Sequence, residues 1–130
     1  MLQREVAQRI AEPPGSKTYG ILSVLLQAWY DIEYLFTVDE HVFNPPPKVK
    51  SGVIRLTRNG VTDLGVDERV FKRIVKNSFG QRRKMLRSSL KSMFSTNPAV
   101  MERDVFRQRP EQLSVEDFID LTKLAMQQEQ

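Results

Sequence analysis

One stretch of apolar residues constrains the fold more than any other feature of this 130-residue chain. The spacing predicts a helix from about Thr18 to Trp29, with aliphatic side chains on most of its faces. A helix of this kind has to be covered on more than one side, so it belongs inside a larger body. The longest apolar stretch, Ile21 to Tyr30, is interrupted by Ser23 and Gln27 and is too short to span a bilayer.

The elements around this helix combine helix and strand. Apolar residues at helical spacing predict a helix over residues 2–11, which Pro13-Pro14-Gly15 ends. Residues 30–38 alternate and are rich in aromatic and β-branched side chains, so they predict a strand, and residues 52–58 predict a second one. Two strands rarely form a stable sheet alone. Residues 1–58 are therefore expected to be part of a larger layered domain, with exposed apolar surface around residues 21–29.

The second half of the chain is predicted to be helical. Residues 59–65 contain glycines and an aspartate and indicate a linker between two domains. Residues 66–130 then predict a first helix that Asp67 caps and Gly80 breaks. A second helix is predicted over residues 81–94, with Met85 on its buried face. A third starts at Ser114, where Asp117 completes a weak capping box.

Composition excludes several classes of site. The chain has no cysteine, which excludes a disulfide framework, a thiol nucleophile and a cysteine-ligated zinc site. A single histidine, His41, excludes clustered-histidine metal sites and argues against a hydrolase triad. The first ten residues are charged throughout and do not resemble a signal peptide. We therefore expect a soluble cytoplasmic protein that binds neither a metal nor a membrane.

Positive charge is concentrated in one stretch of 23 residues, from Arg69 to Lys91. This stretch has nine basic residues and no acidic one, whereas the rest of the chain has 11 basic and 16 acidic residues. The nine are Arg69, Lys72, Arg73, Lys76, Arg82, Arg83, Lys84, Arg87 and Lys91. On a solvated helix face acidic residues normally alternate with basic ones. Their absence favours a surface that binds nucleic acid, and Lys84, Arg87 and Lys91 are expected to form one exposed helical stripe.

Two loops could carry more specific chemistry. Residues 15–20 read G-S-K-T-Y-G, but Ile21-Leu22 follows where a phosphate-binding P-loop needs lysine and a hydroxyl residue, so we interpret this segment as a turn before a helix. Pro45-Pro46-Pro47 predicts a stiff loop with Phe43 at its entrance. The Phe43 ring could stack on a nucleic-acid base, or it could pack in the core beside a rigid crossover.

Several strings together resemble one family, the ribosomal RNA adenine dimethyltransferases. Residues 43–51 read F-N-P-P-P-K-V-K-S and resemble the family motif F-x-P-x-P-K-V-x-S. Residues 1–9 resemble M-x-Q-K-E-V-A-x-R, and residues 15–24 resemble G-x-K-x-Y-G-x-L-S-V. Residues 79–87 resemble F-N-Q-R-R-K-x-L-R, with Gly80 in place of the asparagine, and residues 109–114 resemble R-A/P-E-x-L-S. The strings follow the family's order along essentially the whole chain.

The resemblance implies a fold and a reaction. The fold is α/β plus all-α: the C-terminal strands and helices of a Rossmann-like class I methyltransferase domain (1–58), a linker (59–65) and a small helical RNA-docking domain (66–130). In this family residues 1–3 would end a central strand. The family transfers methyl groups from S-adenosyl-L-methionine to the N6 atoms of two adjacent adenines of 16S ribosomal RNA, and the target base is expected to leave its stack.

The resemblance also assigns roles to residues. By motif match, Phe43 would pack on the flipped adenine. The family's N-L/I-P-Y motif and glycine-rich cofactor loop have no counterpart here, so this chain alone is expected to be a truncated form that binds no cofactor and transfers no methyl group. Its expected partners are small-subunit ribosomal RNA and the pre-mature small subunit. The expected RNA-binding residues are Lys48, Lys76, Arg82, Arg83, Lys84, Arg87 and Lys91.

Two alternatives remain open at this point. The first is a cofactor-free RNA- or ribosome-binding module that uses the basic helices and is compact on its own. The second is a helix-turn-helix DNA-binding protein centred on Gly80, which would need side chains that read base edges as well as side chains that bind phosphates.

Overall fold

The computed structural model describes residues 2–42, 48–60, 63–94 and 98–128. The first part of the chain forms β1 (Leu2–Gln3), α1 (Arg4–Ala11), α2 (Ile21–Gln27), β2 (Tyr30–Val38), the 3-10 helix η1 (Glu40–Val42) and β3 (Ser51–Arg58). The second part forms α3 (Glu68–Gly80), α4 (Leu86–Ser89), η2 (Lys91–Phe94), η3 (Pro98–Glu102), η4 (Asp104–Arg107), η5 (Pro110–Gln112) and α5 (Val115–Gln128). No described residue after Arg58 belongs to a strand, which confirms the helical character predicted for this part.

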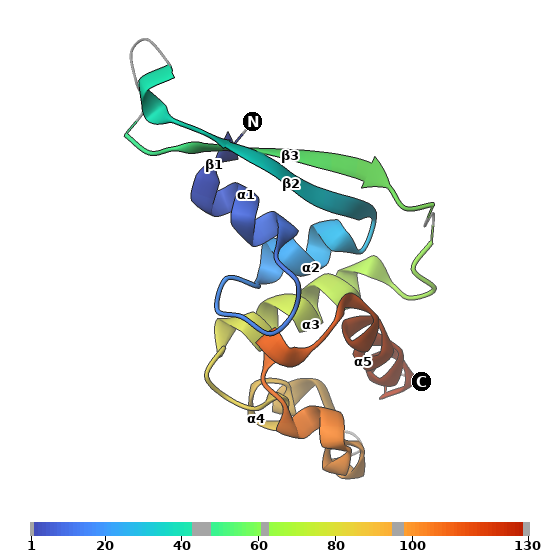
Figure 1. The fold of residues 1–130 in the computed structure, drawn as a ribbon. Helices are drawn as coiled ribbons and strands as arrows, with labels where there is room; N and C mark the ends of the chain where they lie inside the picture. The colour runs from blue at the N-terminus through green and yellow to red at the C-terminus, as the bar shows by residue number, and fades with distance from the viewer. Residues whose placement is uncertain (1, 43–47, 61–62, 95–97, 129–130) are drawn as a thin grey trace.

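The strands form one antiparallel sheet in the order β1–β3–β2. β2 and β3 pair along nearly their whole length, from Tyr30 opposite Arg58 to Val38 opposite Ser51, so both predicted strands are confirmed. In Figure 1, α1 and α2 lie against one face of this sheet, and no described helix lies over the other face. The expectation that the sheet is only part of a larger layered domain stays a prediction.

The first residues differ from the helix predicted over 2–11. Leu2 and Gln3 pair with Gly52 and Ser51 of β3, and α1 begins only at Arg4. Pairing with a strand far along the chain here outweighs the local helical spacing, as tertiary context often does for short segments. The prediction of helix for residues 2 and 3 is therefore wrong, whereas the family resemblance implied a strand there.

Gly52 lets α1 pack closely on the sheet. A Cβ atom at this position would lie 2.7 Å from the Cβ atom of Ala7 and 3.1 Å from the Tyr34 ring. These separations are shorter than a van der Waals contact, so a larger residue would push α1 away from β3. Glycine here serves close packing between a helix and a sheet.

Helix α2 lies between the two halves of the structure. It contacts α1 and β2 on one side and α3 and α5 on the other, which explains why most of its faces are apolar. The Gln27 side-chain amide also donates to the carbonyl oxygens of Ile10 (2.9 Å) and Glu12 (2.8 Å), which ties α2 to the end of α1.

The expectation of exposed apolar surface over residues 21–29 is met only at Leu22, because α2 is covered from both sides. Most of the exposed large apolar side chains lie instead on or beside the strands. They are Leu2, Leu35, Phe36, Val42, Val49 and Leu56, whereas the exposed Met85 lies directly before α4.

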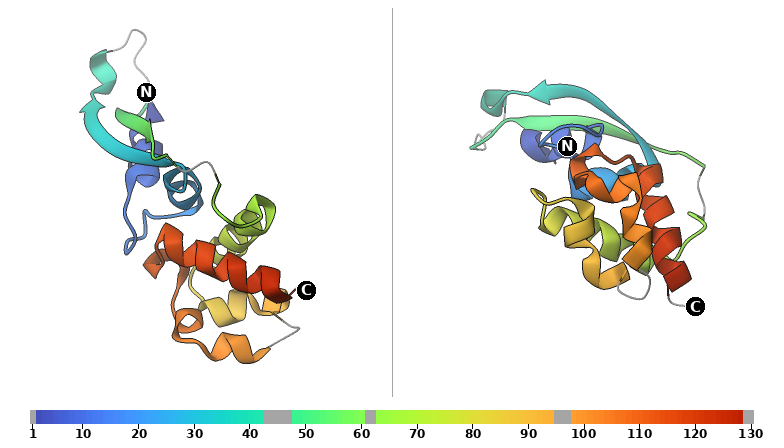
Figure 2. Two further views of the ribbon diagram at one scale, coloured as in Figure 1. Left: turned by 90° about the vertical axis from the view of Figure 1, so that its right-hand side faces the viewer. Right: turned by 90° about the horizontal axis from the view of Figure 1, so that it is seen from below.

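One hydrophobic core joins the parts before and after residues 59–65. Tyr19, Val24 and Ala28 from the first part are buried with side chains of α3 to α5. The largest of these are Phe71, Phe94, Phe106, Phe118, Ile74, Leu86, Leu90, Leu113 and Leu121. Figure 2 shows α2 directly above the bundle formed by α3, α5 and the 3-10 helices. The segment predicted as a linker therefore connects two stretches that share a core.

The continuous helix predicted over residues 81–94 is wrong. The chain turns after Gly80, forms the short helix α4, and continues as the 3-10 helix η2. The Leu86 N–H donates to the carbonyl oxygen of Gln108 (2.9 Å), a residue of a distant segment, so no helical hydrogen bond reaches back from Leu86 into residues 81–85. Met85, predicted to be buried, is exposed, whereas Leu86, Leu90 and Phe94 are fully buried as expected.

The predicted helix caps are confirmed. The Asp67 side chain accepts from the Arg69 N–H (2.8 Å) at the start of α3. Before α5, the Ser114 N–H donates to the Asp117 carboxylate (3.1 Å), and the Asp117 N–H donates to the Ser114 hydroxyl (3.2 Å). These are the two reciprocal bonds of a capping box.

Tyr19 is buried in the core without a partner for its hydroxyl among the described residues. Burial, and to a lesser extent the Asp117 carboxylate, raise the pKa of this hydroxyl. The folded chain thus holds the proton more tightly than the unfolded chain does, so stability is lost as pH rises above the unfolded pKa of about 10.

Phenylalanine at Tyr19 is expected to raise the free energy of unfolding by about 1 kcal/mol at neutral pH, because an unpaired buried hydroxyl is removed. It should also make stability less sensitive to alkali. Denaturant unfolding at about pH 7 and about pH 10.5 measures both effects. Tyr34→Phe is the control, because the Tyr34 hydroxyl is bonded to Thr37. Equal loss of stability in alkali for wild type and Tyr19→Phe would contradict the prediction.

Candidate nucleic-acid interface

Helix α3 exposes four cations on the side opposite its buried residues. Arg69, Lys72, Arg73 and Lys76 follow one another at i, i+3, i+4 and i+7 and are all exposed. The buried residues of the same helix are Val70, Phe71, Ile74, Val75 and Ser78. Among the described residues no acidic side chain forms an ion pair with these four cations. The stripe, which includes the predicted residue Lys76, is thus free to contact phosphates.

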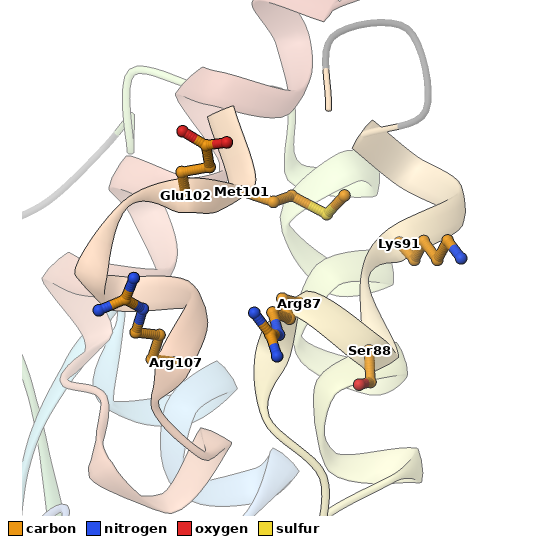
Figure 3. A pocket seen from close by; sticks show the side chains of 6 residues that line it. All are labelled: Arg87, Ser88, Lys91, Met101, Glu102 and Arg107. Carbon is orange, nitrogen blue, oxygen red and sulfur yellow. The ribbon is translucent and has the colours of Figure 1, made fainter. Parts of the chain in front are cut away.

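A hollow of about 480 Å³, which we call the α4 hollow, lies between two segments of the helical part. The first segment comprises α4 and η2, and the second comprises η3 and η4. The lining residues of the hollow are Arg87, Ser88, Lys91, Met101, Glu102 and Arg107. In Figure 3, Arg87 and Met101 extend into the space between the two segments, whereas Lys91 points away from it. Arg87 and Lys91 were both predicted to bind RNA, but they face different directions. The stripe of Lys84, Arg87 and Lys91 does not form, because Lys84 precedes α4.

A second hollow, of about 440 Å³, is built from three segments distant in sequence. It is lined by Lys17 from the turn before α2, Arg82 and Arg83 from the turn after α3, and Arg109 and Glu111 at η5, and we call it the Lys17 hollow. Gly15, whose φ of 110° favours glycine, donates its N–H to the Glu111 carbonyl oxygen at 2.6 Å. This bond fixes the turn that carries Lys17 against η5.

Arg82 fastens the same turn to α3. Its guanidinium donates to the carbonyl oxygens of Ser16 (3.4 Å) and Tyr19, and it lies 5.3 Å from the centre of the Phe79 ring. Phe79 in turn contacts the Tyr19 and Phe118 rings, with centres 5.9 Å and 5.8 Å away. The guanidinium is thus largely occupied by the protein itself. An RNA-binding role for Arg82 stays a prediction, and its clear structural role is to hold the turn.

The structure brings together some predicted residues and adds others. Arg82 and Arg83 meet in the Lys17 hollow, and Arg87 and Lys91 line the α4 hollow. Sequence reasoning missed Lys17, Arg107 and Arg109 as members of this surface, because they lie outside the stretch 69–91. Lys17 and Arg109 did occur in strings that resemble the family, which was the one signal available for them.

Two other predicted residues are not part of this surface. Lys48 is exposed, shortly precedes β3 along the chain, and lines neither hollow. Phe43 and the prolines at 45–47 lie outside the described residues. The roles of Lys48 and Phe43 therefore stay predictions.

Metal ligands are sparse in the described part of the chain. Asp39, Glu40 and His41 are neighbours in sequence, and each could offer one ligand atom within 4.8 Å of the others. Asp39 and His41 are exposed, and the Asp39 carboxylate already accepts from the His41 N–H at 2.9 Å. This local cluster carries no assignment, and the expectation of no metal stays a prediction. None of the described helices has the length and apolar character needed to span a membrane.

Comparison with known proteins gives a consistent result. The family model described as ribosomal RNA adenine dimethylase matches residues 1–127. A protein of Bacteroides thetaiotaomicron named ribosomal RNA small subunit methyltransferase A is 65% identical over 94% of this chain, which corresponds to 46% of that protein. A protein of the same name from Porphyromonas gingivalis is 61% identical over 98% of this chain and 49% of its own length. The chain thus spans about half the length of the curated relatives it matches.

A solved structure supports the fold. The crystal structure of a dimethyladenosine transferase from Plasmodium falciparum superposes with a TM-score of 0.82 over 98% of this chain and 56% of that chain. The two sequences are 20% identical, so this likeness concerns the fold alone. It supports a methyltransferase fold for the described elements.

Proposed function

Because the chain belongs to the ribosomal RNA adenine dimethylase family, we propose that it is the RNA-docking part of a methyltransferase that dimethylates adenines of small-subunit ribosomal RNA. The relatives' name supports the choice of this RNA. The pre-mature small subunit is the proposed physiological partner. In the complete protein, S-adenosyl-L-methionine would supply the methyl groups.

The proposal also assigns separate roles to the two parts of the chain. Residues 1–58 would complete a Rossmann-like methyltransferase domain, and residues 66–130 would form the helical docking domain. The two parts are nevertheless packed together through one core, because α2 packs on α3 and α5 as well as on the sheet. Phe43 would contact the target adenine, as its motif implies.

The observation that carries the proposal is the convergence of cations from separate segments on one hollow. Lys17, Arg83 and Arg109 are 26 or more residues apart in sequence, yet they line the same space. Like charges repel, so such a convergence is unfavourable unless a polyanion offsets it. RNA phosphates provide that charge, and the α4 hollow and the α3 stripe add further cations.

The two basic hollows do not fit S-adenosyl-L-methionine. Its sulfonium centre is a cation, and the linings of these hollows hold three and four cations against one carboxylate each. We therefore keep the expectation that this chain alone binds no cofactor. The residues described here would bind and orient RNA.

Calorimetric titration of the chain tests the proposal. A structured RNA hairpin should bind, with an affinity that falls steeply as salt rises, whereas S-adenosyl-L-methionine should release no heat of binding. Preference for duplex DNA over the hairpin would favour the helix-turn-helix alternative. Failure to bind the hairpin would overturn the docking proposal, and clear cofactor binding would support a different division of the chain.

The same titration addresses the cofactor-free binding module. Equal affinity of the hairpin for this chain and for a longer protein that includes the rest of the methyltransferase would fit both the dimethyltransferase and the binding module. Two results together would favour the dimethyltransferase. The longer relative would transfer methyl groups to adenine, and it would lose this activity when the cations of the Lys17 hollow are replaced. Transfer that is independent of those cations would argue against a docking role.

A further inference from the structure

We propose that the α4 hollow is a site for one unpaired nucleotide of the RNA, whose phosphate binds Arg87 and whose base packs on the Met101 side chain. The inference rests on the proposed RNA-docking function and deepens it. Docking by phosphate contacts alone needs no place for a base, whereas this site provides one.

The two walls of the α4 hollow are joined through the core beneath them. The Leu86 N–H at the start of α4 donates to the carbonyl oxygen of Gln108, directly after η4, at 2.9 Å. The Phe94 ring of η2 meets the Phe106 ring of η4 edge to face, with ring centres 5.1 Å apart, and both rings are fully buried. The hollow is therefore preformed, so a ligand that enters it loses little free energy to rearrangement of the walls.

Arg87 is the cation best placed to bind a phosphate in this hollow. Its side chain extends into the space in Figure 3, and it forms no ion pair among the described residues. Arg107, on the opposite wall, lies 3.7 Å from the exposed Asp104 carboxylate. Such surface pairs contribute little, so Arg107 is also available to an anion. Two arginines from separate segments thus favour a negatively charged ligand.

Met101 adds an apolar surface beside these cations. Its side chain extends into the space from η3 in Figure 3, and it is half-buried because it also packs against the core. Contact with the core holds the side chain in place, and its polarizable thioether suits the flat face of a base. Glu102, the next residue on the same wall, would repel a phosphate, so the phosphate is expected on the Arg87 side.

A nucleotide combines the two groups that this lining can bind. Its phosphate carries negative charge, and its base offers a flat face with little polarity. Neighbouring bases cover both faces of a base in a duplex, so only an unpaired nucleotide, as in a loop or bulge of RNA, can present one. The volume of about 480 Å³ is in the range of small-molecule sites. An acidic peptide could also bind the arginines, but membership of an RNA-modifying family favours the nucleotide.

The test follows the methionine methyl signals of the chain by nuclear magnetic resonance while adenosine monophosphate is added. Met101→Leu identifies the Met101 signal by removing it. The ring current of a base packed on the thioether should move this signal upfield, with half-saturation at about 1 mM, as expected for a few exposed contacts. Ribose phosphate, which lacks the base, should move the signal much less.

The Met126 signal is the internal reference for this titration. The Met126 sulfur accepts from the Asp67 N–H at 3.4 Å, and Met126 lines neither hollow. Its signal should therefore stay in place while the Met101 signal moves.

Arg87→Ala separates phosphate binding from general attraction by positive charge. It should weaken nucleotide binding about fivefold, because one contact between a cation and a phosphate is lost. Arg103→Ala is the matched control, because Arg103 is exposed, lies two residues after Met101 and does not line the hollow. It should leave the affinity nearly unchanged. Equal weakening by both variants would indicate general attraction only and would overturn the site.

The outcomes separate this inference from the docking function on which it rests. An unmoved Met101 signal, or an equal shift with ribose phosphate or with a short glutamate peptide, overturns the nucleotide site, while binding of a structured RNA hairpin would keep the docking proposal. Failure to bind both the hairpin and the nucleotide overturns both proposals. A Met101 shift that requires the base and is weakened by Arg87→Ala alone supports the nucleotide site.

Discussion

Alanine at Arg83, Arg87 and Arg109 together is expected to lower the affinity for a structured RNA hairpin by about 100-fold, because each exposed contact between a cation and a phosphate contributes about 1 kcal/mol. The three residues line the two hollows and form no ion pair among the described residues. The slope of log affinity against log salt should become shallower by about 2 to 3, since about one counterion is released per phosphate contact.

Arg82 is left intact in this variant because the protein itself uses its guanidinium. The control replaces Arg4, Arg55 and Lys123, which are exposed and lie outside both hollows, so the net charge changes equally. Fluorescence anisotropy at several salt concentrations measures affinity and slope for both variants. Equal losses in the two would show that only net charge matters and would contradict the placement of the RNA surface.

Alanine at Arg82 is expected to lower the free energy of unfolding by about 3 kcal/mol, from the loss of charge-assisted hydrogen bonds and of the contact with an aromatic ring. The side chain bonds the Ser16 and Tyr19 carbonyl oxygens and covers Phe79. Its removal leaves carbonyl groups without partners and releases the turn that carries Lys17.

Lysine at the same position separates the stabilisation by the two hydrogen bonds of Arg82 from the stabilisation by its positive charge. Arg82→Lys keeps the charge but not the planar fork that reaches both carbonyl groups, so it should recover less than half of the lost stability. Arg83→Ala, one residue further along and exposed, should leave stability nearly unchanged. Denaturant unfolding followed by circular dichroism provides the comparison. Full recovery by lysine would mean that the charge, and not the two hydrogen bonds, stabilises the turn.

Local signals in the sequence were sufficient for several elements. The alternation over residues 30–38 predicted β2, and β3 was predicted at residues 52–58; the structure pairs the two strands along nearly their whole length. Asp67 and the Ser114–Asp117 pair marked the starts of α3 and α5, because a cap depends on side chains within a few residues of the helix end. The apolar faces of α2 correctly indicated a helix covered from two sides.

What could not be predicted depended on contacts between distant residues. The bond between the Leu86 N–H and the Gln108 carbonyl oxygen stops a helix that the local spacing favours. The pairing of Leu2 with Gly52 turns the start of a helical pattern into a strand. The Lys17 hollow likewise arises only when three separate segments fold together, so a count of charges along the chain cannot reveal it.

The core shared across residues 59–65 limits how the two halves can move relative to each other. A hinge at this segment would have to pull α2 away from α3 and α5 and expose buried side chains such as Val24 and Ala28 to water. Small sliding movements of packed helices avoid that cost, since they keep the apolar surfaces in contact. When RNA docks, we therefore expect α2 to slide slightly over the bundle while the side chains between them repack.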